Sequence, residues 1–572
     1  MRTPLVFPTK IVETKQMTSR QTNPSRIDVK GPRDGLRLLA AAAVAIAGAC
    51  ALPMLAVLLA ALVGGTDTVR HLIETVLLGY AGTTLLLVVF VAVGTFALGV
   101  GAAWLVTMTR FPGAKILEIA LVLPLAFPAY VLAYAYTHVL DHPGIVQATL
   151  RDMTGWGPRD YWFPEIRSLG GAALMLILVL YPYVYLLARA AFLQQSATTF
   201  LAARALGSSA WVAFYKVSLP LARPAIAGGV LLAVMETIAD FGTVAYFGVQ
   251  TFATGIYTSW FSLFDRAGAA QLALCLLSFA LLLAMLERVQ RGKAKYHDPS
   301  RRAVAMPPLQ LTGWRAAAAL VACGLPVLLG AVLPVVILFS MGIGSEQDLL
   351  SPRYLGFIRN SAMLAGIAAA LTVTAAVCVG FFQRLRPGTL SNAAAYVARL
   401  GYAVPGGVIA VGLLVPFAAF DNALDAWMRS TFDISTGLLV TGSIWLLVAA
   451  YMVRFLAAAL GAYEGGQAMV HANMDSAARS LGETPVGTLR RVHLPILSPS
   501  LLTALLIVFV DVMKELPATL IMRPFNYDTL AVQAYRLASD ERLDGAAVPS
   551  LVIVALGLLP VILICRQVGR QR

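Results

Sequence analysis

Four carboxylates stand inside apolar stretches of the sequence, where an ionisable side chain is costly and marks a pathway or a paired network. Glu236 and Asp240 lie four residues apart in one stretch, and Asp511 and Glu515 lie four apart in another. Residues at this spacing share a helical face, so we expect each pair to present two carboxylates together. Because hard cations prefer oxygen ligands, the pairs are candidates for a cation pathway. The equally weighted alternative is a structural network that uses Lys514, one turn from Asp511, and neither interpretation makes a permanent metal site.

A second group of metal-ligating residue types consists of His138, Asp141 and His142, at the end of an apolar run. Two imidazoles at positions i and i+4 can chelate a metal ion. A short polar cluster that caps a spanning helix at the membrane interface is the favoured interpretation. We therefore predict no stable metal site, and metal handling by these three residues is the minor alternative.

One short pattern occurs twice in the chain, 275 residues apart (Gly207 and Gly482). Each copy reads Ala-Ala-Arg-x-Leu-Gly, and a Val-x-Leu-Pro segment follows after nine further residues. The two acidic pairs match at the same offset, so the repeat extends without a gap over roughly sixty residues. The residues that carry the pattern are Ala202, Ala203, Gly207, Leu219, Pro220, Ala477, Ala478, Gly482, Leu494 and Pro495.

The repeated pattern predicts a short helix that projects from the membrane. Ala and Leu favour the helix, and the glycine permits a sharp turn. A second short amphipathic stretch then leads to the Leu-Pro pair that opens the next spanning helix. Such a helix needs a partner surface, which predicts docking, whereas two ordinary helix-glycine-helix loops are the alternative.

Membrane-spanning helices must position these residues. The sequence is 59% hydrophobic and only 13% charged, roughly half the charged share of a soluble domain, which excludes a soluble protein. About 20 apolar residues cross a bilayer, and about 12 stretches qualify, two of them interrupted by acids. We therefore predict an all-α integral membrane protein. The stretches are 38–63, 82–107, 119–137, 168–188, 224–248, 267–286, 316–345, 360–383, 400–420, 434–453, 496–521 and 545–565.

The net charge is +14, and the charged residues are divided unequally between the two predicted sides of the membrane. Lys and Arg gather in alternate loops and in the N-terminal segment, and acids prevail in the other loops, as expected if the basic loops are cytoplasmic. The basic balance thus indicates topology, with both termini cytoplasmic, and excludes a nucleic-acid partner. Because each repeat carries six predicted helices, an even number, both halves enter the membrane in the same direction. The repeats are therefore parallel, and both loops face the cytoplasm.

The spacing of the two loops resembles the E-A-A-x-x-x-G-x(9)-I-x-L-P loop of type I (MetI-like) ABC importer permeases. In that family the loop inserts as a coupling helix into a cleft of the ATP-binding subunit, and two copies in one chain resemble the fused, two-module permeases. The chain departs from the family at the glutamate, which is replaced by Leu201 and Ser476, with Asp475 one residue early. The helix, the glycine turn and the Leu-Pro pair remain.

A narrower resemblance concerns the cargo. Residues 511–532, 537–543 and 180–191 resemble the ferric iron (Fe3+) transport permeases of this superfamily. The resemblance implies ferric iron as the cargo, a hard trivalent cation that carboxylate or phenolate oxygens suit. Fused permeases for thiamine, phosphonate or another small solute share the architecture and are the alternatives.

The resemblance also implies the partners and the energy source. We expect a membrane-spanning subunit in the lipid of the bacterial inner membrane, with two copies of an ATP-binding cassette subunit and a periplasmic substrate-binding protein. The sequence has no G-x-x-x-x-G-K-[ST], H-E-x-x-H or G-x-S-x-G motif, so no enzyme activity and no cofactor in this chain are predicted. ATP and Mg are expected to bind the partner subunits. The alternative of another class is an ion-gradient-driven secondary transporter.

Together these patterns divide the chain into seven segments. They are a disordered basic cytoplasmic tail (1–37), a first anchor helix (38–63), a first permease module (80–287), a basic cytoplasmic linker (288–314), an anchor helix of the second half (315–345), a second permease module (355–566) and a cytoplasmic tail (567–572).

Overall fold

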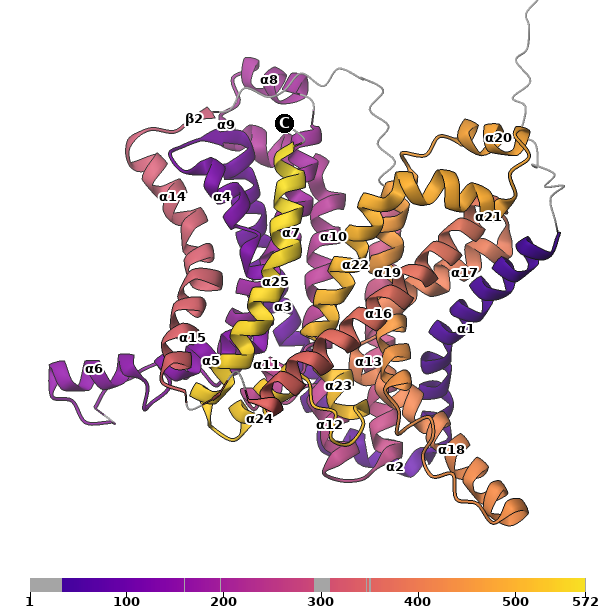
Figure 1. Ribbon diagram of the computed structural model, residues 1–572. Helices are drawn as coiled ribbons and strands as arrows, with labels where there is room; N and C mark the ends of the chain where they lie inside the picture. The colour runs from indigo at the N-terminus through magenta and orange to yellow at the C-terminus, as the bar shows by residue number, and fades with distance from the viewer. Residues whose placement is uncertain are drawn as a thin grey trace, which may run out of the picture.

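The protein is a bundle of long apolar helices (Figure 1). The computed structural model describes residues 33–158, 160–195, 197–292, 309–345, 347–348 and 351–570. Within these ranges 11 helices are long and apolar enough to cross a membrane, or up to 12 if one bent pair counts as a single span. The described residues pair as strands in one place, where β1 (Thr109–Arg110) lies parallel to β2 (Leu309–Gln310). The predicted all-α membrane fold is therefore confirmed.

The helices divide into two halves. The first half contains α1 (Arg33–Val63), α2 (Gly65–Leu72), α3 (Leu78–Met108), α4 (Ala114–Ala120), α5 (Ala129–Leu140), α6 (Ile145–Thr154), α7 (Leu169–Gln194), α8 (Ala197–Ala205), α9 (Ala210–Ala213), α10 (Leu219–Ala239), α11 (Gly242–Tyr246), α12 (Phe252–Phe261) and α13 (Arg266–Gly292). The second half contains α14 (Gly313–Val327), α15 (Leu333–Ile343), α16 (Pro352–Leu385), α17 (Thr389–Leu400), α18 (Gly406–Phe432), α19 (Ile444–Gln467), α20 (Ala472–Ser480), α21 (Pro485–Thr488), α22 (Leu494–Met513), α23 (Pro517–Met522), α24 (Leu530–Ser539) and α25 (Leu543–Arg570). Short 3-10 or π segments are η1 (Ile73–Leu77), η2 (Leu123–Ala126), η3 (Phe214–Ser218), η4 (Leu328–Val332), η5 (Gly401–Ala403) and η6 (Leu489–His493).

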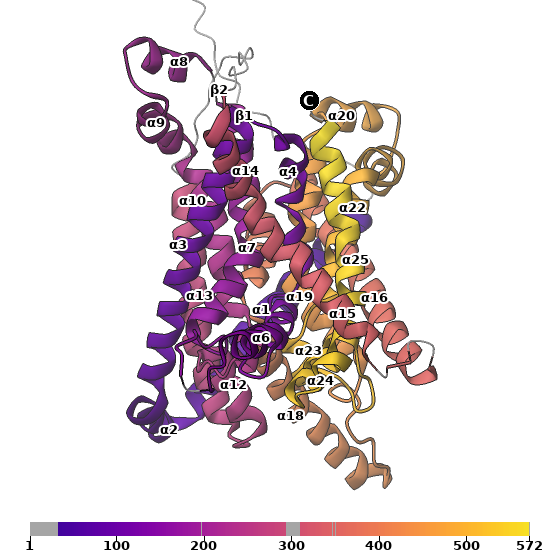
Figure 2. The same ribbon diagram turned by 90° about the vertical axis from the view of Figure 1, so that its left-hand side faces the viewer.

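The repeat in the sequence is a repeat in the structure. The elements from α7 to η3 recur from α19 to η6 in the same order, so that α8 begins at Ala197 and α20 begins at Ala472. The next spanning helices, α10 and α22, begin at Leu219 and Leu494 and keep the same offset. Both copies of the short loop lie at the same end of the molecule (Figures 1 and 2), so the two halves are parallel as predicted.

The two ends of the bundle differ in what they carry. The end with α8 and α20, which we call the loop end, also carries the C-terminus (Figure 2). Helix α1 begins at this end, where it contacts α21. The other end, which we call the opposite end, carries α6, α12, α24 and the far part of α18. The loops and both ends of the described chain thus share one side.

Each half is braced by the first helix of the other half. Helix α1 packs on α16, α17 and α18, and the unit of α14 and α15 packs on α3, α4 and α5 as well as on α25. Gly412 of α18 permits a close approach, because an added Cβ there would lie 2.3 Å from the carbonyl oxygen of Pro53 on α1. The two halves therefore form a single interlocked bundle with one apolar core.

The predicted span over residues 119–137 is wrong as a single helix. The chain there forms η2 and then α5, with a bend of 93° between the flanking helical parts. Pro128 lacks an amide donor and disfavours helical backbone at Phe127, whose φ and ψ are −92° and 132°. The chain therefore changes direction between η2, which ends at Ala126, and α5, which begins at Ala129.

Several predicted boundaries also move. The predicted tail 1–37 overlaps α1, which already begins at Arg33, and its residues 1–32 lie outside the described residues. Residues 293–308 of the predicted linker and residues 571–572 of the C-terminal tail also lie outside them. Helix α18 extends to Phe432, and α19 begins only at Ile444.

The late start of α19 has a local cause. Residues between α18 and α19 fold against the end of α18 as an irregular loop. The buried Asp421 side chain accepts hydrogen bonds from the amides of Val440 (3.1 Å) and Thr441 (2.8 Å). These bonds satisfy backbone donors that a helix would otherwise engage.

Candidate translocation cavity and paired loops

All four predicted pathway carboxylates line one cavity between the halves. Its volume is about 110 Å³, room for several waters, since one water needs about 10–15 Å³. Its walls come from α5, α7, α10 and η5 together with α19, α22 and the segments that follow α10 and α22. The polar lining residues are Tyr130, Tyr183, Glu236, Asp240, Tyr402, Arg454, Asp511, Lys514 and Glu515.

The prediction that each acidic pair shares a helical face is wrong. Helix α10 ends at Ala239 and helix α22 ends at Met513, so Asp240 and Glu515 lie beyond the last helical residue. Asp240 has extended backbone, with φ and ψ of −68° and 131°. Residues at i and i+4 share a face only within a continuous helix, and each helix ends before the second acid of its pair.

Asp240 and Glu515 instead cap the short helices that come next. Each carboxylate accepts hydrogen bonds from the backbone amides three and four residues later, at the starts of α11 and α23. A cap of this kind stabilises a helix by about 0.5–2 kcal/mol. The matched bonds show that this pair of acids has a structural role in both halves. The donors are the amides of Thr243 (3.1 Å), Val244 (3.2 Å), Ala518 (2.9 Å) and Thr519 (3.0 Å).

Glu236 and Asp511 are the other matched pair, and neither caps a helix. Glu236 accepts a hydrogen bond from the hydroxyl of Tyr402 at 2.8 Å, across the interface between the halves. Asp511 pairs with the ammonium of Lys514 at 2.9 Å. The structural alternative for the acids thus holds in part, because Lys514 does pair with Asp511 as the sequence suggested.

The cavity has cations from the second half alone. Arg454 of α19 lies 3.9 Å from Glu515, and its buried Nη1 has no hydrogen-bond partner. Gly406 permits this approach, because an added Cβ would lie 2.5 Å from Nη1 of Arg454 and 2.7 Å from Oε1 of Glu515. At the matched positions of the first half stand Val179 and Ala239, both apolar. The acids of the cavity are symmetric, and its cations are not.

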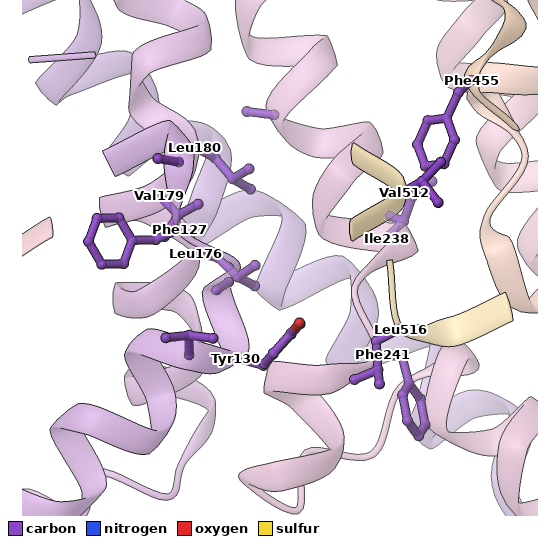
Figure 3. Packing of buried hydrophobic residues seen from close by; sticks show 14 of the residues in the cluster. Phe127, Tyr130, Leu176, Val179, Leu180, Ile238, Phe241, Phe455, Val512 and Leu516 are labelled. Atoms are coloured by element: carbon purple, nitrogen blue, oxygen red, sulfur yellow. The ribbon is translucent and has the colours of Figure 1, made fainter. Parts of the chain in front are cut away.

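Apolar side chains close the rest of the cavity wall. Figure 3 shows Leu176 and Leu180 on one side and Phe455 on the other, with the hydroxyl of Tyr130 directed into the space between them. That hydroxyl donates to the backbone oxygen of Lys514 at 3.3 Å, which again links the two halves. Low polarity around the acids strengthens every charge interaction inside the cavity.

His138, Asp141 and His142 do not form a chelating face. Helix α5 ends at Leu140, so the two imidazoles are not on one helix. His138 lies 3.9 Å from Asp544, and Asp141 pairs with Arg167. No group of three or more His, Cys, Asp or Glu side chains suited to a metal ion occurs among the described residues.

Arg167 joins the halves at the opposite end of the bundle. Its guanidinium donates to Asp141 at 2.9 Å and makes two bonds to Glu541 of the second half, at 2.6 and 2.8 Å. These hydrogen bonds lower the pKa of Glu541 below its usual value. The contact holds the segment before α7 against the turn between α24 and α25, so the halves are tied together on this side.

The two predicted docking loops have nearly identical geometry. Gly207 and Gly482 end α8 and α20 with φ angles of +86° and +82°, in the left-handed region that favours glycine. In both copies a hydroxyl residue, Ser209 or Thr484, then caps the next short helix. The Leu-Pro pairs begin α10 and α22. The loop fold predicted from the sequence is confirmed in both halves.

The loops are held to the bundle by different chemistry. In the second half Asp475 pairs with Arg384 of α16 (2.8 Å) and with the buried His493 (2.6 Å). At the matched positions of the first half stand Phe200, Thr109 and Ser218. There an aromatic cluster packs the loop against the bundle instead. The centroid of the Trp104 ring lies 4.3 to 5.9 Å from the ring centroids of its neighbours. The neighbours are Phe192, Phe200 and Phe214.

Sequence reasoning missed three polar residues of the cavity, Tyr130, Tyr402 and Arg454. Arg454 is a lone cation within the apolar helix α19, and that isolation is a signal that could have identified it. Tyr402 sits at a helix start and has no such signal, because tyrosines are frequent in this chain. Its role depends on the contact with Glu236 from the other half.

Comparison with known proteins gives consistent matches over both halves. The family described as "Binding-protein-dependent transport system inner membrane component" matches residues 95–294 and 363–571. The Fe(3+)-transport system permease protein FbpB 2 of Haemophilus influenzae is 27% identical over 90% of this chain and 95% of its own length. The ferric transport system permease protein FbpB of Actinobacillus pleuropneumoniae is 24% identical, over 86% of this chain and 71% of its own. The molybdenum transport system permease protein ModB of Escherichia coli is 29% identical but covers only 33% of this chain.

Proposed function

Because this chain belongs to the family of binding-protein-dependent transport system inner membrane components, we propose that it imports ferric iron in an ATP-driven complex. Both halves match the family, so one chain supplies the two modules of the permease. It is a multi-pass membrane protein whose described residues include 11 or 12 apolar helices long enough to span a membrane. The proposed location is the bacterial inner membrane, with the loop end and both termini in the cytoplasm.

The energy source in this proposal is ATP hydrolysis by partner subunits. The two loops stand at one end and contain the same sequence of elements, which suits two copies of an ATP-binding cassette subunit. ATP and Mg would bind those subunits, and this chain would contribute no catalytic group. A periplasmic substrate-binding protein would deliver the cargo at the opposite end.

The cargo is proposed from the cavity together with the relatives. Two relatives that extend over most of the chain have printed names that specify ferric transport. The observation that carries the proposal is the cavity between the halves, lined by carboxylates and tyrosine hydroxyls. A hard trivalent cation prefers these oxygen ligands. Thiamine, a phosphonate or another small solute is the alternative, and an anionic solute would face repulsion from Glu236 and Asp511.

The proposed mechanism is alternating access. Closure of the ATP-binding subunits would move the two loops together, and the rigid helices α10 and α22 would transmit that motion to the cavity. The Arg167 to Glu541 contact ties the two halves together at the opposite end, and in this mechanism it would have to break when the halves separate to admit cargo. Such a two-state element is what a ligand or a partner can shift.

Reconstitution tests the proposal. The chain is purified with its co-encoded ATP-binding subunits, placed in proteoliposomes and supplied with the co-encoded binding protein loaded with ferric iron, thiamine or a phosphonate. We expect iron uptake that needs both ATP and the binding protein. Uptake of another solute in place of iron would refute the cargo, and uptake driven by an ion gradient without ATP would support a secondary transporter.

A further inference from the structure

Lys514 occupies a position in the cavity that a cationic cargo would need. Its ammonium lies 2.9 Å from Asp511, and both side chains remain about a quarter exposed, at 24% and 23%. We infer that Lys514 is a built-in counter-cation, which the cargo displaces from Asp511 on entry and which displaces the cargo in turn. The inference rests on the proposed function, because only a cationic cargo competes with an ammonium.

The asymmetry of the cavity supports this role. Glu236 and Asp511 stand at matched positions, yet Glu236 is satisfied by the neutral hydroxyl of Tyr402. Asp511 instead pairs with the charged ammonium of Lys514, three residues later. The position that matches Lys514 in the first half is Ala239. Ala239 also lines the cavity, so the matched position of the first half faces the same space without a charge. The cation is therefore a specific feature of one half and no general requirement of the fold.

The chemistry of lysine suits a competitor that must move. An ammonium is a compact charge on a flexible four-carbon stem, and it binds a carboxylate without the rigid two-point geometry of arginine. A trivalent ion attracts the same carboxylate more strongly and can displace the ammonium. Once cargo leaves, the tethered ammonium returns without diffusion from solvent.

Transport needs this kind of weak site. A path conducts only when a site binds its ion well enough to admit it and weakly enough to release it. Carboxylates in a cavity of low polarity would hold a trivalent ion too tightly. A competing ammonium beside Asp511 lowers that affinity, which shortens the time that cargo stays in the cavity.

Terbium(III) binding measures the effect directly, because terbium is a hard trivalent ion whose luminescence rises when carboxylates replace its water. The complete complex is purified without nucleotide, as wild type and as Lys514→Ala. We expect Lys514→Ala to bind terbium about tenfold more tightly or more, since one unit charge at this distance changes cation affinity by at least that factor. The exposed Lys115, outside the cavity, gives the matched control Lys115→Ala with unchanged affinity.

Two double variants locate the effect. Adding Asp511→Asn to Lys514→Ala should abolish the tighter binding, because the freed carboxylate is then gone. Adding Ala239→Lys to Lys514→Ala should return affinity toward wild type, because the new lysine stands three residues after Glu236 as Lys514 stands after Asp511. Tightening that persists without the Asp511 carboxylate would overturn the inference, as would normal affinity in folded Lys514→Ala.

The design also covers a variant that fails to fold. Ala239→Lys in the wild-type background adds a second cation and should weaken terbium binding about tenfold, by the same Coulomb argument. Unchanged affinity there overturns the inference without any need for Lys514→Ala. Iron uptake by the wild-type complex is measured in parallel. Iron uptake together with unaltered terbium affinity refutes the counter-cation alone, whereas no iron uptake by the wild type refutes the proposed cargo.

Discussion

The glycine turns of the two loops offer a sharp test of force transmission. Gly207 and Gly482 have φ angles of +86° and +82°. An added Cβ at either position would meet nothing within 4 Å, so a larger side chain has room and the only penalty is in the backbone. We predict that Gly207→Val and Gly482→Val impair coupling between ATP hydrolysis and transport, while the protein remains folded and inserted.

The magnitude follows from the backbone alone. A residue with a Cβ costs about 1–2 kcal/mol in left-handed backbone, and a β-branched side chain is the least tolerant of it. A cost of this size lowers the ratio of the native turn to its alternative conformations about 5- to 30-fold. Gly207 and Gly482 are exposed and are not part of the apolar core, so the effect should stay local to the loop. The double variant should lose most ATP-driven uptake.

The assay compares uptake with ATPase activity in proteoliposomes. Gly207→Asn and Gly482→Asn should retain most uptake, because asparagine adopts left-handed backbone more readily than other non-glycine residues. Gly155→Val is the matched control: Gly155 ends α6 with φ of +72°, has equally open surroundings and lies at the opposite end. We expect little loss of uptake there. Normal uptake per ATP in the double valine variant would refute the coupling role of the loops.

Further predictions concern the acids, the loop anchors and the contact at the opposite end. Asp240→Ala should destabilise the fold by about 0.5–2 kcal/mol through loss of a cap, and Glu515→Ala should cost more, because it also leaves Arg454 without its charge partner; thermal unfolding measures both. Glu236→Gln and Asp511→Asn should instead lower iron uptake with normal yield, and equal behaviour of the two pairs would contradict this division. Asp475→Ala leaves the Arg384 guanidinium without its carboxylate partner. Trp104→Ala removes the ring that contacts the other three members of the aromatic cluster. Each should cost about 3–5 kcal/mol, and limited proteolysis should show the cleaved loop to be α20 in the first variant and α8 in the second. Because Arg167 lowers the pKa of Glu541, their contact stabilises the folded state above the ordinary glutamate pKa of about 4.3 and is lost as pH falls through the lowered value. The melting temperature of Glu541→Gln should therefore lie below that of wild type by a constant amount from about pH 6 to 8, and the difference should shrink as the pH falls below about 4.3 and vanish below the lowered pKa of Glu541; a difference that grew on acidification would contradict this sign.

Local composition made much of the fold predictable. Long apolar runs can satisfy their backbone in a membrane only as helices, so the class and the approximate number of spans follow from the sequence. The repeat places Gly207 and Gly482 at matched turns, because a helix end in left-handed backbone is a local event that glycine encodes. Breaks inside spans were harder to predict. Pro128 can be read in the sequence as a possible helix break. Whether the chain bends there depends on whether neighbouring groups can form hydrogen bonds with the backbone groups that lose their helical partners.

The roles of the acids were decided by tertiary structure. The sequence identified four acids as matched pairs, because each is a charge within an apolar run and the two pairs lie at the constant offset of the repeat. These acids are Glu236, Asp240, Asp511 and Glu515. It could not divide them into cavity groups and helix caps, because that depends on where α10 and α22 stop. The contact of Tyr402 with Glu236 was equally invisible.

Sequence separation explains this limit. A helix turn or a cap involves residues within four positions of one another, so a short stretch of sequence determines its stability. Tyr402 and Glu236 are 166 residues apart, and Arg167 and Glu541 are 374 apart. Such pairs meet only because packing of the two halves fixes where each side chain points. The sequence by itself thus determined the membrane fold, the repeat and the loops, whereas the pairing of charges inside the cavity and across the opposite end was decided by how the halves pack.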